Sequence, residues 1–423
     1  MSSGPKRVVI VGQGYVGLPI AVRAVEYGHV VIGFEANDER VRRLKIGDSY
    51  VEDISDLTLA RCLESGRYLP TSAIKECAGF DVAVFTVPTP LRDGLPDLSF
   101  IEDSAAQLAP LITLGATVIL ESTTYPGTTE EIFVPILENG SCLVAGKDFF
   151  VGYSPERIDP GNTLWRLENT PKVVSGINQA SLERVCAFYD TIVEVTVPVS
   201  GTREAELTKL LENTFRHVNI ALVNELAMFA ADLSVDIWES IDAANTKPFG
   251  YMKFTPGPGV GGHCLPIDPS YLSWKVKQEL GTPFQFVELA NDVNDHMPHY
   301  VARRVTSMLN RDRKPVNGAR ILVLGMAYKK NTGDGREAPA RTLCRILYEM
   351  GAEIRVVDPL LDEIQFPDYV EHVKLVESEL RNADLTIVVT DHDQLDWDLV
   401  ANAAGQVLDT RHRLSAASNV EFL

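Results

Sequence analysis

The chain has 423 residues, 45% of them hydrophobic and 23% charged, which is typical of a globular protein with two or three domains and large buried cores. Its formal net charge of −19 argues against a nucleic-acid or anionic-membrane partner, because both need a basic surface. No apolar run reaches the length of a membrane span, and residues 1–7 lack the apolar stretch of a secretory signal, so we expect a cytoplasmic protein.

Apolar strands alternate with helical stretches in the first third of the chain. The predicted strands cover 8–11, 30–34, 82–86, 117–121 and 148–153. Strands separated by helical patterns predict a parallel, doubly wound sheet. We therefore expect a first α/β domain over residues 1–200.

A glycine-rich turn follows the first predicted strand. Gly12, Gly14 and Gly17 form a GxGxxG motif that opens a helix, where glycines permit a tight turn and close approach of a pyrophosphate. Glu35 ends the second strand, where a carboxylate accepts hydrogen bonds from ribose hydroxyls and repels a 2′-phosphate. The pattern predicts a dinucleotide site that prefers NAD. Three nearby arginines keep NADP open as the alternative: Arg40, Arg42 and Arg43.

Polar segments follow the third and fourth predicted strands. Thr89 lies in the first of them, within 88–90, and Glu121 and Thr123 lie in the second. Ligands bind at the carboxyl ends of strands in open α/β sheets, so both segments are candidate ligand contacts. Ordinary turn chemistry is the alternative for each segment alone.

The pattern becomes helical over 203–244, which contains no proline and no glycine. Its two apolar faces predict a domain-bridging spine or the interface of a homodimer, within a central helical domain at 201–300. Lys209 and Asn213 are four residues apart and share one helix face. A solvated face is the alternative for that pair.

A glycine-rich loop at 257–268 presents Cys264, with Asp268 four residues later. A thiol joined to a dinucleotide site suggests oxidation of an alcohol past the aldehyde, because a thiolate can add to the aldehyde carbonyl. We assign no base role to His263, since adjacent side chains usually diverge. The eight histidines lack metal-ligand spacing, and the six cysteines lack CxxC spacing, so we expect no metal site, no disulfide framework and mostly buried thiols.

Apolar alternation returns at 321–324, 354–357, 385–389 and 406–408. These strands predict a second, smaller Rossmann-like unit over 301–423. The fold class is therefore α/β, with two doubly wound domains joined by a helical domain that contains one long helix. The two α/β domains at the ends of the chain are candidates for distant structural repeats of one another.

Together these motifs resemble the UDP-glucose/GDP-mannose dehydrogenase family, the nucleotide-sugar 6-dehydrogenases. The resemblance covers nearly the whole chain and rests on residues 12–19, 87–90, 121–129, 153–162, 207–225, 257–272 and 325–339. Two motifs, SPER at 154–157 and GGHCLPIDP at 261–269, are most similar to the branch acting on UDP-N-acetylhexosamines, especially UDP-N-acetylglucosamine. UDP-glucose and dTDP-glucose are the alternative substrates.

The resemblance implies a role for each matching residue. Cys264 is then the nucleophile, Glu156 the base for hydrolysis, and Lys209 and Asn213 steady the oxygen on C6. Asp268 and Thr123 order the water. The implied NAD contacts are Gly12, Gly14, Tyr15, Val16, Gly17, Glu35, Thr89 and Glu121. The implied substrate contacts are Arg157, Lys209, Lys247, Gly261, Lys329, Arg336 and Arg411.

The implied reaction is a four-electron oxidation of C6 to the uronic acid, with two NAD consumed, in nucleotide-sugar metabolism for polysaccharide biosynthesis. Two departures concern the sugar. Pro160 stands where UDP-glucose dehydrogenases carry a second glutamate, and Lys247 is the nearest match to an arginine that they place before the cysteine loop. The resemblance also implies a homodimer or a higher assembly. A β-hydroxyacid dehydrogenase and a non-catalytic NAD-binding protein are the rival interpretations.

Overall fold

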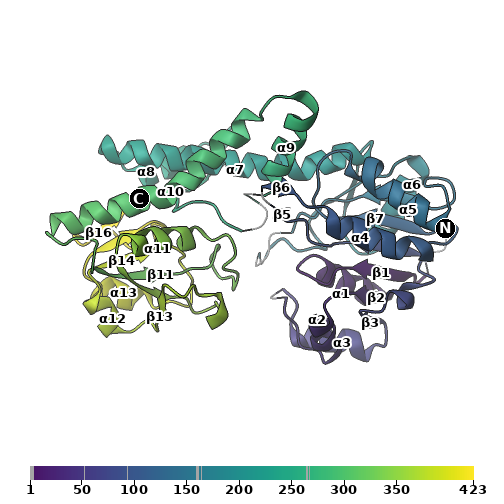
Figure 1. Ribbon diagram of the computed structural model, residues 1–423, viewed down its shortest axis with the longest axis horizontal. Coiled ribbons are helices and arrows are strands. Elements are labelled where there is room, and N and C mark those ends of the chain that lie inside the picture. The colour runs from purple at the N-terminus through teal and green to yellow at the C-terminus, as the bar shows by residue number, and fades with distance from the viewer. Residues whose placement is uncertain are drawn as a thin grey trace. The chain divides into compact units, whose positions relative to one another are not determined.

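The computed structural model describes residues 4–51, 53–92, 94–158, 162, 164–262, 265 and 267–423. Three residues singled out in the sequence, Pro160, His263 and Cys264, lie outside this described part. The chain divides into two compact units, Met1–Glu212 and Asn213–Leu423, whose elements are labelled in Figure 1. The division falls inside the long helix α7 (Thr202–Asp232).

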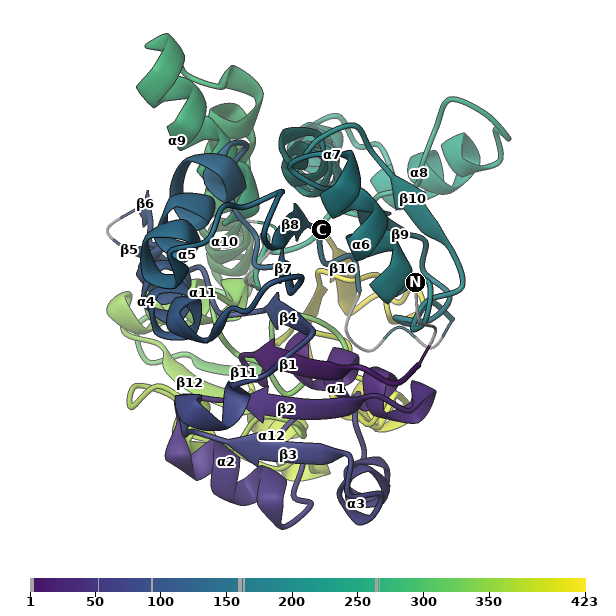
Figure 2. The ribbon, with the colours of Figure 1, turned by 90° about the vertical axis from the view of Figure 1, so that its right-hand side faces the viewer.

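The first unit is built on a six-stranded sheet in the order β3-β2-β1-β4-β7-β8, with every neighbouring pair parallel. Figure 2 shows these strands stacked in that order. They are β1 (Arg7–Val11), β2 (Val30–Phe34), β3 (Tyr68–Thr71), β4 (Val82–Phe85), β7 (Thr117–Leu120) and β8 (Phe150–Tyr153). This order is that of a dinucleotide-binding Rossmann sheet, and it confirms the predicted doubly wound fold.

Helices and short strands complete the first unit. The helices are α1 (Gly17–Tyr27), α2 (Asp38–Lys45), α3 (Asp56–Glu64), α4 (Ser99–Leu108), α5 (Val134–Ser141) and α6 (Gln179–Tyr189). The short strands are β5 (Leu91–Arg92), β6 (Leu95–Pro96), β9 (Lys172–Val174) and β10 (Thr196–Pro198). Single helical turns cover Ile74–Cys77, Ala109–Leu111 and Thr129–Phe133. The short pair β9–β10 is parallel and separate from the main sheet.

Side-chain caps explain where several helices begin. Asn37 accepts from the backbone N–H groups of Glu39 and Arg40 at the start of α2. Ser55 and Asn178 cap α3 and α6 in the same way. Such caps satisfy N–H groups that have no partner inside the helix, so they fix the first turn.

The helical segment is close to its predicted limits of 203–244. It consists of α7 and α8 (Ile237–Asn245), and α9 (Asp268–Leu280) and α10 (Gln285–Arg311) follow. Asp236 caps α8 by accepting from two backbone N–H groups. Among the helices of the described chain, none is long and apolar enough to pass through a membrane.

The second unit carries a sheet with the same strand order as the first, β13-β12-β11-β14-β15-β16. Its strands are β11 (Arg320–Leu324), β12 (Glu353–Val357), β13 (Glu371–His372), β14 (Leu385–Val388), β15 (Val407–Asp409) and β16 (Val420–Phe422). Its further helices are α11 (Pro339–Glu349), α12 (Glu377–Asn382) and α13 (Trp397–Ala403), with a single turn at Glu363–Gln365.

The turn after the first strand is also the same in both sheets. Gly12 donates to Phe34 O and Gly325 donates to Val357 O, each at 2.8 Å. Both glycines have a positive φ, +91° and +83°. The suspected structural repeat between the two α/β domains is therefore present in the strand order and in the geometry of the first turn.

Alternate residues of the central strand β11 face opposite cores, as a strand requires. Ile321 and Val323 pack in one buried cluster, and Leu322 and Leu324 pack in another. In the first unit, Val8 and Ile10 of β1 belong to a corresponding core.

The cysteines of the described chain are free thiols. Cys62, Cys77 and Cys344 are buried, as expected, and Cys186 is half-buried. Cys142 departs from the expectation, because it is exposed in a left-handed conformation at the end of α5.

Candidate active site

The glycine-rich turn between β1 and α1 has one open position and two tightly packed ones. A Cβ atom on Gly12 would lie 2.9 Å from Thr86 O, and one on Gly17 would lie 1.9 Å from Gly12 O. At Gly14 a Cβ would meet no described heavy atom within 4 Å. Tyr15 beside it is 39% exposed. The packed glycines shape the turn, and the open one leaves its backbone accessible at the start of a helix, so this turn fits a pyrophosphate.

Glu35 is held firmly at the carboxyl end of β2. Its Oε2 accepts from the Gln13 N–H at 3.2 Å, and its Oε1 accepts from the Asn37 N–H at 3.0 Å. Arg40 lies 3.7 Å from the same carboxylate. A carboxylate fixed here favours a ribose with free hydroxyls over one that carries a phosphate.

The other two arginines that kept NADP open are engaged by acids. Arg42 pairs with Glu39. Arg43 donates to both carboxylate oxygens of Asp48, at 2.7 and 3.0 Å. These ion pairs weaken the case for a 2′-phosphate site.

Glu121 lies at the centre of a buried polar cluster. Its Oε1 accepts from the Tyr189 hydroxyl and lies 2.7 Å from Nζ of Lys172. Burial raises the pKa of the Glu121 carboxyl, and the Lys172 ammonium works against that rise. Burial likewise raises the pKa of Tyr189 well above its usual value. The role of Glu121 as a cofactor contact stays a prediction, while the structure gives it a buried cation as partner.

Glu156 lies beside the same cation. Its Oε2 is 3.7 Å from Lys172 Nζ, and its Oε1 accepts from the Ile158 N–H. Lys172 also donates to Pro155 O at 3.1 Å. Our reading of the sequence missed Lys172. The available signal was a lysine at the start of the apolar strand segment Lys172–Val174, all of which is buried.

The remaining predicted site residues of the first unit differ in their burial and in their hydrogen-bond partners. Arg157 pairs with Glu212, with nitrogen–oxygen distances of 2.7 and 3.3 Å, and donates to Pro171 O. Lys209 is buried. Thr89 and Thr123 are half-buried in the segments that follow β4 and β7. The guanidinium of Arg157 is thus bound to a carboxylate of its own unit, and a substrate contact there stays a prediction.

In the second unit, two of the predicted catalytic residues meet. Asn213 of α7 donates its side-chain N–H to Oδ2 of Asp268, the first residue of α9. Both side chains are buried. The pairing fixes the orientation of the Asn213 amide, because one of its two N–H groups is committed to the carboxylate.

A buried asparagine ladder that we did not predict holds the start of the glycine-rich loop. Asn224 of α7 accepts from the Gly257 N–H at 2.9 Å and donates to Asn294 of α10 at 2.9 Å. His217 lies within 3.4 Å of the Asn294 amide. The signal in the sequence was a pair of asparagines inside apolar helical patterns.

Glycine is required where the loop packs closely. A Cβ on Gly261 would lie 2.6 Å from Glu337 O. Gly262 has φ +87° and packs against the Tyr328 ring. Close packing therefore explains why positions 261 and 262 are glycines. The predicted contact of Gly261 with the substrate stays a prediction.

The predicted cations of the second unit have varied surroundings. Arg336 pairs with both oxygens of Asp334, at 2.8 and 2.6 Å. Arg411 donates to Val389 O at 2.7 Å and packs against Gly257. Lys329 is half-buried, and Lys247 is exposed over the Phe249 ring. Their roles toward a nucleotide sugar stay predictions.

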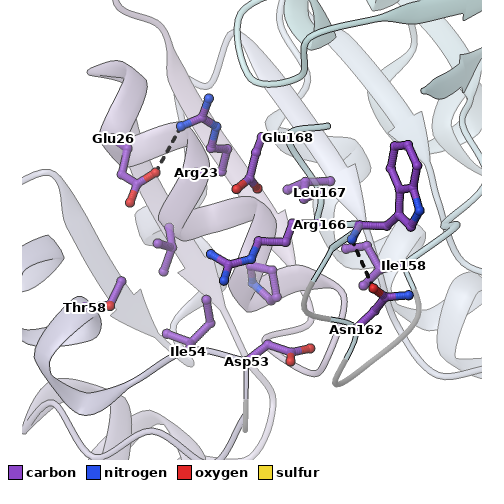
Figure 3. Close-up of a pocket in the computed structure, with 13 residues that line it drawn as sticks. Arg23, Glu26, Asp53, Ile54, Thr58, Ile158, Asn162, Arg166, Leu167 and Glu168 are labelled. Carbon is purple, nitrogen blue, oxygen red and sulfur yellow. Dashed lines mark hydrogen bonds and ion pairs between the residues drawn. The ribbon is translucent and has the colours of Figure 1, made fainter. Parts of the chain in front are cut away.

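A separate pocket of about 470 Å³ lies beside α1 and is drawn in Figure 3. Its rim includes the Arg23–Glu26 ion pair, and Asn162 accepts from the Trp165 N–H nearby. None of the predicted cofactor, substrate or catalytic residues lines it. This pocket is therefore distinct from the glycine-rich turn.

Comparison with known proteins is consistent along the whole chain. Residues 6–193, 203–296 and 322–416 match the NAD-binding, central and UDP-binding domains of the UDP-glucose/GDP-mannose dehydrogenase family. A UDP-N-acetyl-D-mannosamine dehydrogenase of Pyrococcus horikoshii is 34% identical, over 94% of this chain and 93% of its own length. A UDP-N-acetyl-D-glucosamine 6-dehydrogenase of Pseudomonas aeruginosa is 37% identical, over 84% and 82%.

Solved structures agree. A UDP-D-ManNAc dehydrogenase from Pyrococcus horikoshii matches with TM-score 0.90 and 32% identity, covering 98% of both chains. A UDP-glucose dehydrogenase from Pyrobaculum islandicum matches with TM-score 0.87 and 27% identity, covering 100% of this chain and 97% of that one. The resemblance inferred from the motifs is thus confirmed, and the chain belongs to the UDP-glucose/GDP-mannose dehydrogenase family of NAD-dependent oxidoreductases that act on nucleotide sugars.

Proposed function

We propose that this chain oxidises the C6 hydroxymethyl group of a UDP-N-acetylhexosamine to the carboxylate. The observation that carries the proposal is the buried pairing of Asn213 with Asp268, the helix-starting residue that follows the Cys264 loop in sequence. The sugar class is supported by relatives named for UDP-N-acetyl-D-mannosamine and UDP-N-acetyl-D-glucosamine, which differ only in configuration at C2. The cytoplasmic location stays a prediction.

Gly12, Gly14, Gly17 and Glu35 are the residues proposed to hold NAD; each NAD molecule, when bound, would accept one hydride from C6, so two are needed in turn. The thiolate of Cys264 adds to the C6 aldehyde, because a carbonyl carbon needs an added nucleophile before it readily loses a second hydride. The resulting thiohemiacetal becomes a thioester. Water then cleaves the thioester, and Glu156 takes the proton of that water.

The oxygen on C6 becomes negatively charged during these steps. Lys209 offers a positive charge toward it, and Asn213 offers the N–H group that Asp268 does not use. One donor of this kind is typically worth about 2.7–4 kcal/mol of barrier. The pair therefore serves as the oxyanion stabiliser in our scheme.

We also propose that a second copy of the chain covers α7. Large apolar side chains on this helix are 42–63% exposed, more than a helix of a stable monomer usually leaves open. They are Leu207, Leu211, Phe215, Leu222, Leu226 and Phe229. A closed twofold pair is the commonest way to bury such a surface.

A panel of nucleotide sugars tests the substrate class. NADH formation is measured with UDP-N-acetylglucosamine, UDP-N-acetylmannosamine, UDP-glucose and dTDP-glucose at equal concentration. We expect the highest kcat/KM with one of the two N-acetylhexosamines. A higher value for UDP-glucose would reject the proposed sugar class and leave the reaction standing.

A further inference from the structure

A buried ammonium stands between two carboxylates in the first unit. The side chain of Lys172 is 3% exposed, that of Glu121 is 0% exposed and that of Glu156 is 10% exposed. The Lys172 Nζ lies 2.7 Å from Oε1 of Glu121 and 3.7 Å from Oε2 of Glu156. Because an unpaired buried charge is strongly unfavourable, the ammonium and the two carboxylates depend on one another.

Hydrogen bonds make the two carboxylates unequal partners. Glu121 Oε1 lies 2.7 Å from Lys172 Nζ, whereas the nearest oxygen of Glu156, Oε2, lies 3.7 Å away; Oε2 of each carboxylate has no hydrogen-bond partner among the described residues. Lys172 also donates to the carbonyl of Pro155, one residue before Glu156, at 3.1 Å. The lysine therefore fixes the backbone that carries Glu156 and leaves one oxygen of that carboxylate within electrostatic reach but unbound.

A small cavity of about 10 Å³ is lined by Glu156, Lys172 and neighbouring residues. That volume is roughly what one water molecule requires. Because both side chains are buried, solvent screens their attraction less than it would at the surface.

The surroundings of Glu156 contain several other titratable or charged groups. Arg157, the next residue, is neutralised by Glu212 of α7. Among the described residues, the groups that interact electrostatically with Glu156 include Lys172 of β9, Glu121 of the turn after β7 and Tyr189 of α6.

We propose that Lys172 is a positioning residue for Glu156, holding its backbone and aiming its carboxylate for thioester hydrolysis, an inference that rests on the function proposed above. In that step the water oxygen bonds to the acyl carbon, the carbon–sulfur bond breaks with its electrons going to sulfur, and Glu156 takes the proton. The Lys172 ammonium lies 3.7 Å from the Glu156 carboxylate and donates to Pro155 O, so it holds both that side chain and the backbone before it.

Two substitutions separate this role from a merely structural one. Lys172→Met removes the ammonium, whereas Lys172→Arg keeps a cation that can still donate to Pro155 O. We expect Lys172→Met to slow steady-state hydrolysis at least about tenfold, since a positioned base contributes about 10²–10⁴-fold. The burst of NADH that precedes hydrolysis should keep its amplitude, and Lys172→Arg should restore most of the steady-state rate.

Folding is controlled by a third variant. Lys172→Met leaves Glu121 buried without its cation, so the double variant Lys172→Met with Glu121→Gln removes both charges together. Thermal unfolding and circular dichroism report whether each variant is folded. The double variant should share the slow hydrolysis of Lys172→Met, since the cation that positions Glu156 is missing from both.

The acyl-enzyme gives a second readout. Intact-protein mass spectrometry follows the sugar nucleotide attached through Cys264 during turnover. We expect this adduct to accumulate in Lys172→Met and not in the wild type or in Lys172→Arg. Wild-type hydrolysis in Lys172→Met would overturn the proposal, and so would slow hydrolysis without the adduct. If the wild type forms no NADH from any nucleotide sugar, the proposed function fails, whereas a wild type that turns over beside an unaffected Lys172→Met defeats only the role given to Lys172.

Discussion

Thr129 donates both its backbone N–H and its hydroxyl to one carboxylate oxygen of Glu206, at 2.9 and 2.6 Å. The other oxygen accepts from the Gly127 N–H at 2.6 Å. Glu206 belongs to α7 and is completely buried, so this single side chain ties the first part of the long helix to the segment that leads into α5.

Burial raises the pKa of Glu206 from 4.5 to about 7, although its three donors oppose the rise. The pKa is higher in the folded state than in the unfolded state. The associated stability is therefore present below about pH 4.5 and is lost as the pH rises through about 7, a change of roughly 3 kcal/mol. Glu206→Gln should flatten this part of the dependence. Urea unfolding between pH 4.5 and 8 measures it, with the exposed Glu131→Gln as control, and parallel curves for wild type and Glu206→Gln would contradict the assignment.

The two kinds of glycine in the first turn should respond differently to alanine. Gly17→Ala places a Cβ 1.9 Å from Gly12 O, so the variant should lose thermal stability. Gly14→Ala meets open space and should keep the wild-type melting temperature. It should nevertheless bind NAD at least about tenfold more weakly, about 1.4 kcal/mol, because the methyl group occupies the approach to the backbone. Calorimetry of NAD binding checks this, and unchanged affinity in Gly14→Ala would show that the cofactor does not approach there.

Cofactor choice should depend on Glu35. We expect NAD to be preferred over NADP by at least about tenfold in kcat/KM, and Glu35→Ala to reduce that preference. The ion pair of Arg40 with Glu35 makes the effect larger, since the variant frees an arginine for a 2′-phosphate. Equal kcat/KM values for the two cofactors in the wild type would defeat the role given to Glu35.

The apolar face of α7 should control assembly. Leu211 and Phe229 are 63% and 53% exposed. Leu211→Glu and Phe229→Glu should each shift a homodimer toward monomer in sedimentation velocity at micromolar concentration, because a charge would be buried without a partner. Leu114→Glu, at an exposed position outside α7, is the control. A monomeric wild type would refute the proposed pairing.

The sequence predicted the central strands well, because β1, β4 and β7 are short apolar runs that can only be buried. It missed β3, β13 and β16, which lie at or beside sheet edges and are short or polar. Pro70 in β3 argued against a strand, and an edge position is where a sheet tolerates proline.

For a similar reason, the sequence predicted some residues of the site and missed others. Motif spacing indicated Asn213 and Asp268, which the structure brings together. Motif spacing did not indicate Lys172 or Asn224, a polar residue in an apolar segment in each case, because their partners are distant in the sequence and are defined only by folding. Glu121 was interpreted from its position at a strand end, but its burial against Lys172 depends on a strand 51 residues later.

The most direct test of the central claim is the number of NADH molecules formed per molecule of nucleotide sugar consumed to completion. We expect two, with a carboxylate at C6 and no free aldehyde. We further expect that Glu156→Gln gives a burst of about two NADH per active site, with the sugar nucleotide attached through Cys264 by mass spectrometry, while Cys264→Ser gives no such adduct. One NADH per sugar, as expected of a β-hydroxyacid dehydrogenase, or none, would contradict the central claim.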